Sequence, residues 1–179
     1  GKEFIGVIAG ADNQEYRDDK IKKHEATLTK REEMFIDYLD IVGYNAEPVL
    51  LSYPHNEKIA HTLDNYTKAR PEYEFTTTDR LKHELWVLNE KQTAELQQLF
   101  LDVPALYIAD GHHRAKSASR AREEKKEANS KHVGDEEYNY FVAVLFPAEQ
   151  LKILPYNRVV FDLNKLSKED FLNSVSEKF

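Results

Sequence analysis

A short apolar segment in the middle of the chain leads directly into polar and glycine residues and then into a helical pattern. Residues 105–109 (Ala-Leu-Tyr-Ile-Ala) follow Pro104 and precede residues 110–114 (Asp-Gly-His-His-Arg). Five consecutive apolar residues between turn signals are typical of a fully buried strand. Small residues recur afterwards at helical spacing, at Ala115, Ala118 and Ala121. The sequence therefore predicts a buried strand, a sharp turn and a helix, which requires a fold that mixes both kinds of element.

The remaining hydrophobic pattern predicts further strands and helices in irregular order. We expect a polar loop over residues 12–23 and an extended stretch over residues 151–163. Thr29 and Glu32 form the pattern of a capping box, Gly43 would end that helix, and Ser167 with Asp170 indicates another capped helix. Strands are expected at 4–9, 48–53 and 138–146, a hairpin at 72–78 with 81–88, and helices at 29–42, 55–69 and 93–101. This order predicts an α+β fold with a mixed, partly barrel-like sheet and outer helices, and argues against a regular doubly wound sheet.

The size and charge of the chain fit one globular domain over residues 1–179. The chain has 179 residues and 41% hydrophobic residues, with 25 Lys and Arg against 32 Asp and Glu, a net charge of −7. No apolar run reaches the length of about 20 residues that crosses a bilayer, and the first residues lack the pattern of a signal peptide. We therefore expect a cytoplasmic protein without a membrane partner. The chain lacks an initiator Met and stops at Phe179 inside an amphipathic pattern, so we interpret it as a piece of a longer protein.

Two features of the composition exclude whole classes of function. The chain has no cysteine, which excludes disulfides, thiolate zinc sites and cysteine nucleophiles. The acidic balance argues against a nucleic-acid partner, because nucleic-acid binding depends on Lys and Arg that neutralise phosphates. Small-molecule partners are therefore favoured.

The turn after the buried strand carries groups that suit an anion. A helix that starts after a sharp turn points free backbone N–H groups at a ligand, and Gly111 lets the backbone approach closely. His112 and His113 can donate ring N–H bonds, and the Arg114 guanidinium matches two phosphate oxygens. Asp110 can cap the helix, accept from the histidines or hold Mg²⁺ beside a phosphate. Simple capping of a helix remains the alternative.

Other binding motifs are incomplete. Neither His24 nor His83 begins a full HExxH zinc motif, because Leu28 and Val87 occupy the second ligand position. No P-loop motif occurs, and Gly6 and Gly10 alone do not form a dinucleotide-binding fingerprint.

Two further segments carry candidate site residues. His24 and Glu25 precede the first long helix, where Glu25 is either a helix-flanking acid or a general base for a hydroxyl group. Residues 154–158 (Leu-Pro-Tyr-Asn-Arg) form either a bend between strands or a loop that closes over the same site with Asn157 and Arg158.

Together, these segments resemble a large bacterial and archaeal family that is known only as a domain of unknown function (family 1015). The resemblance rests on His24-Glu25, the strand leading into residues 110–114, and residues 154–158. It covers almost the whole chain, and members of that family are typically longer.

The turn and the His-Glu pair also resemble the free serine kinase of the ParB/sulfiredoxin-like superfamily, which phosphorylates free L-serine with a nucleotide donor. This resemblance implies a ParB/sulfiredoxin-like core, with Glu25 as the catalytic base beside His24. It also implies that residues 110–114 bind the donor phosphates. The region between Tyr53 and Phe100 lengthens the spacing from Glu25 to Asp110, so the hydroxyl substrate is left open. Sulfiredoxin chemistry requires a cysteine and is impossible in this chain.

Three hypotheses follow for the function. The first is a phosphotransferase that uses ATP or ADP with Mg²⁺ and acts on a small hydroxyl compound such as free serine. The second is a module that binds nucleotide or phosphate without chemistry. The third, a nuclease or DNA-binding activity, conflicts with the net charge of −7.

Overall fold

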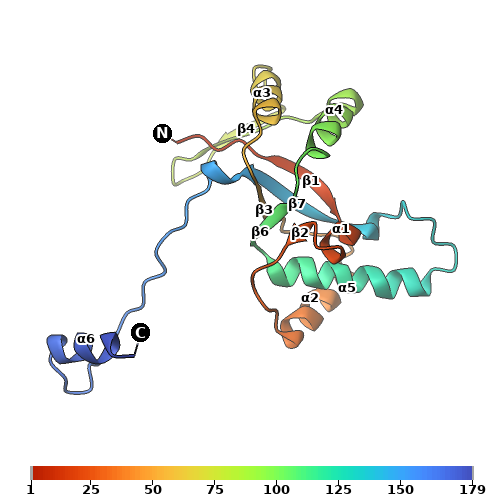
Figure 1. Cartoon of the computed structure of the whole chain (residues 1–179). Helices are drawn as coiled ribbons and strands as arrows, with labels where there is room; N and C mark the ends of the chain where they lie inside the picture. The colour runs from red at the N-terminus through yellow and green to blue at the C-terminus, as the bar shows by residue number, and fades with distance from the viewer. Residues whose placement is uncertain (1, 179) are drawn as a thin grey trace.

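A mixed five-stranded sheet forms the centre of the protein in the computed structural model, which describes residues 2–178 (Figure 1). Gly1 and Phe179, on which the expectation of cut ends depends, lie outside these described residues. The strand order is β1-β7-β3-β6-β2. Two strand pairs are antiparallel, β1 with β7 and β3 with β6. The other two pairs, β3 with β7 and β2 with β6, are parallel. The strands are β1 (Val7–Asp12), β2 (Ile21–Lys22), β3 (Val49–Tyr53), β6 (Leu106–Asp110) and β7 (Tyr140–Pro147).

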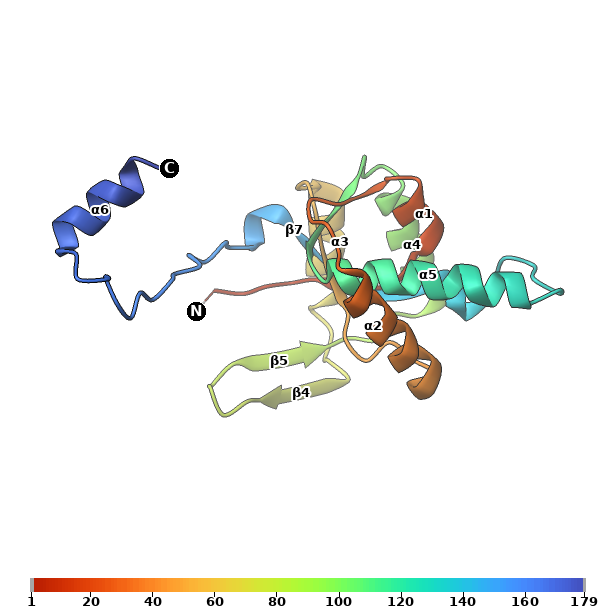
Figure 2. The same ribbon diagram turned by 90° about the horizontal axis from the view of Figure 1, so that it is seen from below.

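The α+β prediction is therefore confirmed. The sheet is mixed, and it stays open with β1 and β2 at its two edges, so it does not close into a barrel. The predicted hairpin is also present as a separate two-stranded sheet of β4 (Tyr73–Thr76) and β5 (Lys82–Leu85). Figure 2 shows this hairpin projecting from the body of the protein.

Helices connect the strands, and one further helix follows the last strand. They are α1 (Asn13–Arg17), α2 (Thr29–Val42), α3 (Glu57–Tyr66), α4 (Glu90–Phe100), α5 (His112–Ala128) and α6 (Lys168–Ser176), with short 3-10 turns η1 (Glu137–Asn139) and η2 (Ala148–Gln150). In Figure 1, α3 and α4 lie beside each other, and α2 lies beside α5. Within residues 2–178, no helix has the length and apolar character needed to cross a membrane.

The core forms on one face of the sheet because side chains alternate along each strand. Val49, Leu51 and Tyr53 of β3 are buried, as are alternate residues of β7 from Phe141 to Leu145. Ala115 and Ala118 of α5 are buried against this cluster, and Ala121 is also buried. Their small side chains allow a long helix to pack closely beneath the sheet, as the small-residue pattern predicts.

Several local predictions were wrong. β1 begins at Val7, three residues later than expected, and residues 12–23 contain α1 and β2 instead of a loop. Thr29 does not cap α2, because Leu28 is the N-cap residue and makes no side-chain capping bond. The Glu32 carboxylate is instead buried, where it accepts from Thr27 Oγ1 at 2.5 Å and from Arg120 Nη1 at 3.0 Å. Arg120 on α5, which is distant in the sequence, thus binds the Glu32 carboxylate that was predicted to cap α2. Gly43 ends α2 with φ of +81°, as predicted.

The strand that leads into the turn is less buried than its composition indicates. Only Ile108 of β6 is buried, whereas Tyr107 and Ala109 point to the other side of the sheet and are exposed. The unbroken apolar run therefore predicted the strand correctly, but the strand is buried on one face only.

The C-terminal part lies apart from the sheet. Residues 151–167 run away from the body after η2 and lead into α6 (Figures 1 and 2). The predicted cap of this last helix is confirmed, because Ser167 Oγ accepts from the Asp170 backbone N–H at 3.1 Å.

Candidate functional site

A single glycine turns the chain from β6 into α5. β6 ends at Asp110 and α5 begins at His112, and Gly111 between them has φ of +93°. This left-handed conformation is unfavourable for residues with a side chain. A Cβ atom on Gly111 would also lie 3.2 Å from the Arg114 guanidinium, which is tighter than ordinary contact. Both the backbone and the neighbouring arginine therefore require glycine here.

The start of α5 has no side-chain cap. Gly111 is the N-cap residue, no side chain caps the helix, and its first turn contains no acidic residue. The first backbone bond of the helix runs from the Ala115 N–H to the Gly111 carbonyl, at 2.9 Å. The preceding N–H groups point out of the 17-residue helix at its positive end, the arrangement that binds phosphate in other proteins. The interpretation of Asp110 as the helix cap is therefore wrong.

Arg114 folds back across the glycine. Its Nη2 donates to Asp110 Oδ2 at 2.7 Å, and its Nη1 donates to the Pro48 carbonyl. The Glu47 carboxylate lies 3.5 Å from Nη1. The guanidinium thus ties the start of α5 to the end of β6 and to the residue before β3.

His112 brings the His-Glu pair to the same place. The buried imidazole accepts from the His24 backbone N–H through Nε2 at 3.4 Å, although 88 positions separate the two residues. Its Nδ1 therefore carries the proton and lies 3.4 Å from Glu25 Oε2. The His24 ring packs edge-on against the His112 ring, with 4.3 Å between centroids.

His113 holds the next part of the same segment. Its Nε2 accepts from the Leu28 backbone N–H at 3.1 Å, immediately before α2. The two histidines of the turn thus fix residues 24–28 against the start of α5.

Burial determines the charge of His112. Loss of solvent lowers the pKa of His112 below its ordinary value of 6.5, and the nearby His24 lowers it further. Glu25 and Asp110 oppose this shift but do not reverse it. His112 is therefore neutral at pH 7 and can donate one ring N–H toward Glu25.

Nearly all the predicted site residues come together in the structure. His24, Glu25 and residues 110–114 surround the start of α5. Asn157 and Arg158 do not join them, because they lie in the extended segment that leaves the body, where the Arg158 guanidinium sits 4.2 Å over the Tyr156 ring. The binding and catalytic roles of all these residues remain predictions.

The site also uses groups that the sequence did not indicate. The Pro48 carbonyl and the Leu28 N–H are backbone groups, which leave no signal in the residue type. Glu47 had no motif around it and enters only because β3 lies next to β6.

The side chains present fit a metal ion only in a limited way. Among residues 2–178, no three His, Asp or Glu side chains gather closely enough to hold an ion by themselves. Asp110 is a single exposed carboxylate with one oxygen bonded to Arg114. One carboxylate suits Mg²⁺ that is held mainly by phosphate oxygens and water.

The fold and the turn define an α+β protein with an uncapped helix start beside a His-Glu pair. The chain belongs to the family described as "Protein of unknown function (DUF1015)", which matches residues 1–179. No curated protein and no solved structure matches the chain.

Substitution of Gly111 tests the turn. Gly43 is a matched control, because its φ is +81° but no atom lies within 4 Å of a Cβ placed there. Left-handed strain costs about 1 to 2 kcal/mol per residue, so Gly43→Ala should lower the free energy of unfolding by about that amount. Gly111→Ala should cost at least about 1 kcal/mol more, because it also disturbs the hydrogen bonds of Arg114. Chemical denaturation measures both values, and equal losses would contradict the role given to Arg114.

The histidine pKa values give a second test. In one NMR titration, His112 should titrate below pH 6.5 because it is buried, and His55 above pH 6.5 because it bonds to Glu57 and Glu149. The lowered pKa of His112 means that the unfolded chain binds its proton more tightly. The contribution of His112 to stability is therefore complete above pH 6.5 and is lost as the pH falls toward its folded pKa. A His112→Asn variant should lose less stability over this range, and a His112 midpoint above 6.5 would refute its assigned burial.

Proposed function

We propose that the start of α5 binds the terminal phosphates of a nucleotide and that Glu25 acts as the general base for a small hydroxyl compound. The observation that carries this proposal is the position of Glu25, whose carboxylate lies 3.4 Å from His112 at the uncapped end of the helix. The uncapped helix start and the Glu25 carboxylate thus lie together, although they are distant in the sequence.

The resemblance to the free serine kinase supports this proposal, and the structure addresses its main difficulty. The region between Tyr53 and Phe100 contains α3, the β4-β5 hairpin and α4. Even with this region present, Glu25 and Asp110 both lie close enough to His112 to influence its pKa. The longer spacing therefore does not separate the proposed base from the proposed phosphate site.

The proposed reaction is a phosphoryl transfer. Glu25 accepts the proton of the substrate hydroxyl, whose oxygen then forms a bond to the terminal phosphorus as the bond to the leaving phosphate oxygen breaks. ATP would leave as ADP, or ADP as AMP, and the substrate would become a phosphate monoester. Such reactions depend mainly on positioning and on neutralising charge. The open N–H groups of α5 and the Arg114 guanidinium would supply part of that neutralisation.

Neutral His112 would hold the base in place. Its Nδ1 lies 3.4 Å from Glu25 Oε2 and would keep the carboxylate beside the helix start. Glu25 itself is exposed, with 59% of its side chain accessible, so it can reach an incoming hydroxyl. Mg²⁺, when bound with the nucleotide, would supply further neutralisation of the phosphates, with Asp110 as the protein ligand.

A second function has its own supporting observation. His112 Nε2, His113 Nε2 and both terminal nitrogens of Arg114 already have partners within the protein. These side chains therefore fix the turn, and the backbone N–H groups can bind phosphate without any transfer. This arrangement suits a regulatory module that binds nucleotide but performs no chemistry.

Binding is tested by calorimetry with ATP and ADP in the presence of Mg²⁺. We expect saturable binding that weakens at least tenfold in Arg114→Gln. Lys126→Gln is the matched control, because Lys126 lies at the far end of α5 and its loss changes the net charge equally. An equal effect of the two substitutions, or no binding by the original chain, would overturn the phosphate site.

Catalysis is tested separately with Glu25→Gln. Loss of a general base reduces the rate by about 100-fold or more. We therefore expect ³¹P NMR to show phosphate monoester formation from serine or another small hydroxyl compound with the original chain, and at least 100-fold less with Glu25→Gln. Nucleotide affinity should stay within about twofold, because Glu25 does not contact the phosphates in this proposal. Binding without turnover in either protein would favour the regulatory module.

A further inference from the structure

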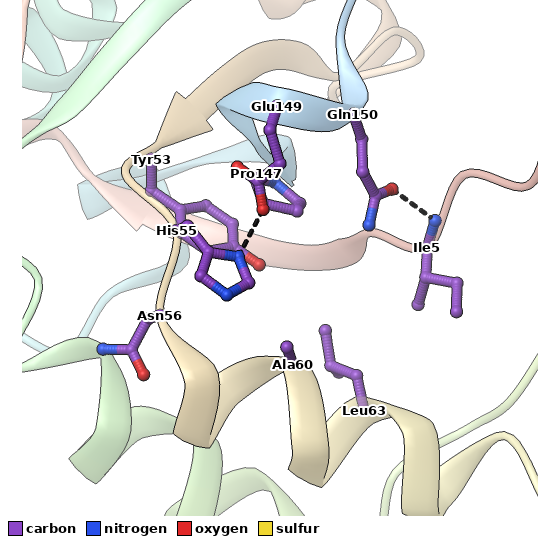
Figure 3. A pocket seen from close by; sticks show the side chains of 9 residues that line it. All are labelled: Ile5, Tyr53, His55, Asn56, Ala60, Leu63, Pro147, Glu149 and Gln150. Carbon is purple, nitrogen blue, oxygen red and sulfur yellow. Dashed lines mark hydrogen bonds and ion pairs between the residues drawn. The ribbon is translucent and has the colours of Figure 1, made fainter.

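A cavity lies at the other end of the central strands, away from the start of α5. β3 and β7 are parallel neighbours, and their carboxyl ends reach Tyr53 and Pro147. A cavity of about 160 Å³ opens there, between the start of α3 and η2 (Figure 3). The turn described above lies near the opposite end of β3, where Arg114 bonds to Pro48. The carboxyl ends of parallel strands are the usual place for ligands in open sheets.

The cavity has both an apolar wall and polar groups. Its apolar wall is formed by Ile5, Ala60, Leu63 and Pro147, and its polar groups come from Tyr53, His55, Asn56, Glu149 and Gln150. Figure 3 shows these side chains arranged around one space, with those of α3 on one side and those of η2 on the other. A volume of 160 Å³ corresponds to about five waters at roughly 30 Å³ each. A ligand there must be small.

His55 is fully engaged at the rim of the cavity. Its Nδ1 bonds to Glu149 Oε1, and its Nε2 lies 3.1 Å from Glu57 Oε1. Both ring nitrogens therefore donate to carboxylates, which raises the pKa of His55 and favours the imidazolium form. The second oxygen of Glu149, Oε2, has no hydrogen-bond partner within residues 2–178.

Tyr53 supplies an unpartnered polar group. Its side chain is 98% buried, since its relative exposure is only 2%, and no hydrogen bond to its hydroxyl exists among residues 2–178. Within these residues, Asn13 Oδ1 is the only side-chain polar atom that is both fully enclosed and without a hydrogen-bond partner. The Tyr53 hydroxyl also lacks a partner, so it is not fully enclosed. The Tyr53 hydroxyl is therefore reached from the cavity that its ring lines. Burial and the charge of Glu149 raise the pKa of Tyr53 to about 12, so the hydroxyl stays neutral.

Charged side chains of both signs lie around the cavity. Two carboxylates, Glu57 and Glu149, face the single imidazolium of His55. Lys2 is the nearest further cation in the contacts of these residues, and it is bonded to the backbone carbonyl of Gln150. Glu149 is the charged group that acts on the Tyr53 hydroxyl. The unpaired oxygen of Glu149 and the Tyr53 hydroxyl can both accept hydrogen bonds from a cationic donor.

We propose that this cavity binds a small aliphatic ammonium compound. The ammonium group would donate to Glu149 Oε2 and to the Tyr53 hydroxyl oxygen, neither of which has a hydrogen-bond partner within residues 2–178. The alkyl part would pack on Ile5, Ala60, Leu63 and Pro147. This site is independent of the phosphate site, because it lies at the opposite end of β3 and shares no residue with it.

Three probes with one carbon skeleton test the proposal on the whole chain. They are 3-methylbutylamine, 3-methylbutanol and 3-methylbutanoate, whose affinities are measured by NMR titration of the backbone amides. We expect the amine to bind at least tenfold more tightly than the other two and to shift amide signals of residues 53–60 and 147–150. Equal binding of all three would mean that the cavity holds the alkyl part and does not recognise the ammonium group. Tighter binding of the carboxylate would mean that the cavity favours an anion. Either result would overturn the proposal.

Two isosteric variants locate the contacts. Tyr53→Phe and Glu149→Gln should each weaken amine binding at least fivefold, whereas their controls at exposed positions, Tyr73→Phe and Glu127→Gln, should leave it unchanged. Thermal denaturation of each variant verifies that it is folded, and the Phe variant keeps the ring that fills the core. Unchanged amine affinity in both cavity variants would overturn the proposal. Nucleotide binding should persist in Tyr53→Phe, so failure of this site is distinguishable from failure of the phosphate site.

Discussion

The hydrogen bonds of Arg114 across Gly111 are the constraint on which the candidate site depends. The left-handed glycine lets β6 pass into α5 without a capping side chain, and the guanidinium then joins the turn to Asp110 and to the Pro48 carbonyl. Because α5 is the longest helix among the described residues and packs on the core through its alanines, this junction sets the position of the helix start. His112 and His113 then hold residues 24–28 in place. A buried helix and an exposed carboxylate are thereby brought into one site.

The central strand connects two regions of different chemistry. At the beginning of β3, the Arg114 guanidinium lies between the carboxylates of Asp110 and Glu47, beside the uncapped N–H groups that we propose bind phosphate. At its end, Glu149 and the buried Tyr53 hydroxyl offer hydrogen-bond acceptors to a cavity. β3 is the middle strand of the sheet and is paired with β6 and β7, so the two regions lie at opposite ends of one central strand. If both proposals hold, the protein recognises an anion and an amine at separate places.

The sequence predicted the local elements and the composition of the site better than its contacts. The apolar run before Asp110, the alanine spacing of α5 and the hairpin were all recognisable, because strand and helix periodicities depend on neighbouring residues. Glu32 shows the limit: its spacing from Thr29 indicated a local cap, but Arg120 from a distant helix takes the carboxylate. The same holds for Tyr53 and Glu149, since only the parallel pairing of β3 with β7 brings them to one cavity. Contacts between distant segments, and bonds to backbone groups such as Pro48, leave no pattern in one sequence.

An NMR titration of the uniformly ¹⁵N-labelled chain with the Mg²⁺ complex of ATP tests the central claim most directly. If the start of α5 binds phosphate, the amide signals of residues 111–114 should move progressively to saturation, together with those of residues 24–28 that the two histidines hold. Signals of the cavity at the end of β3, at residues 53–60, should stay in place. Saturation that moves the cavity signals while residues 111–114 remain unchanged would contradict the assignment of the phosphate site.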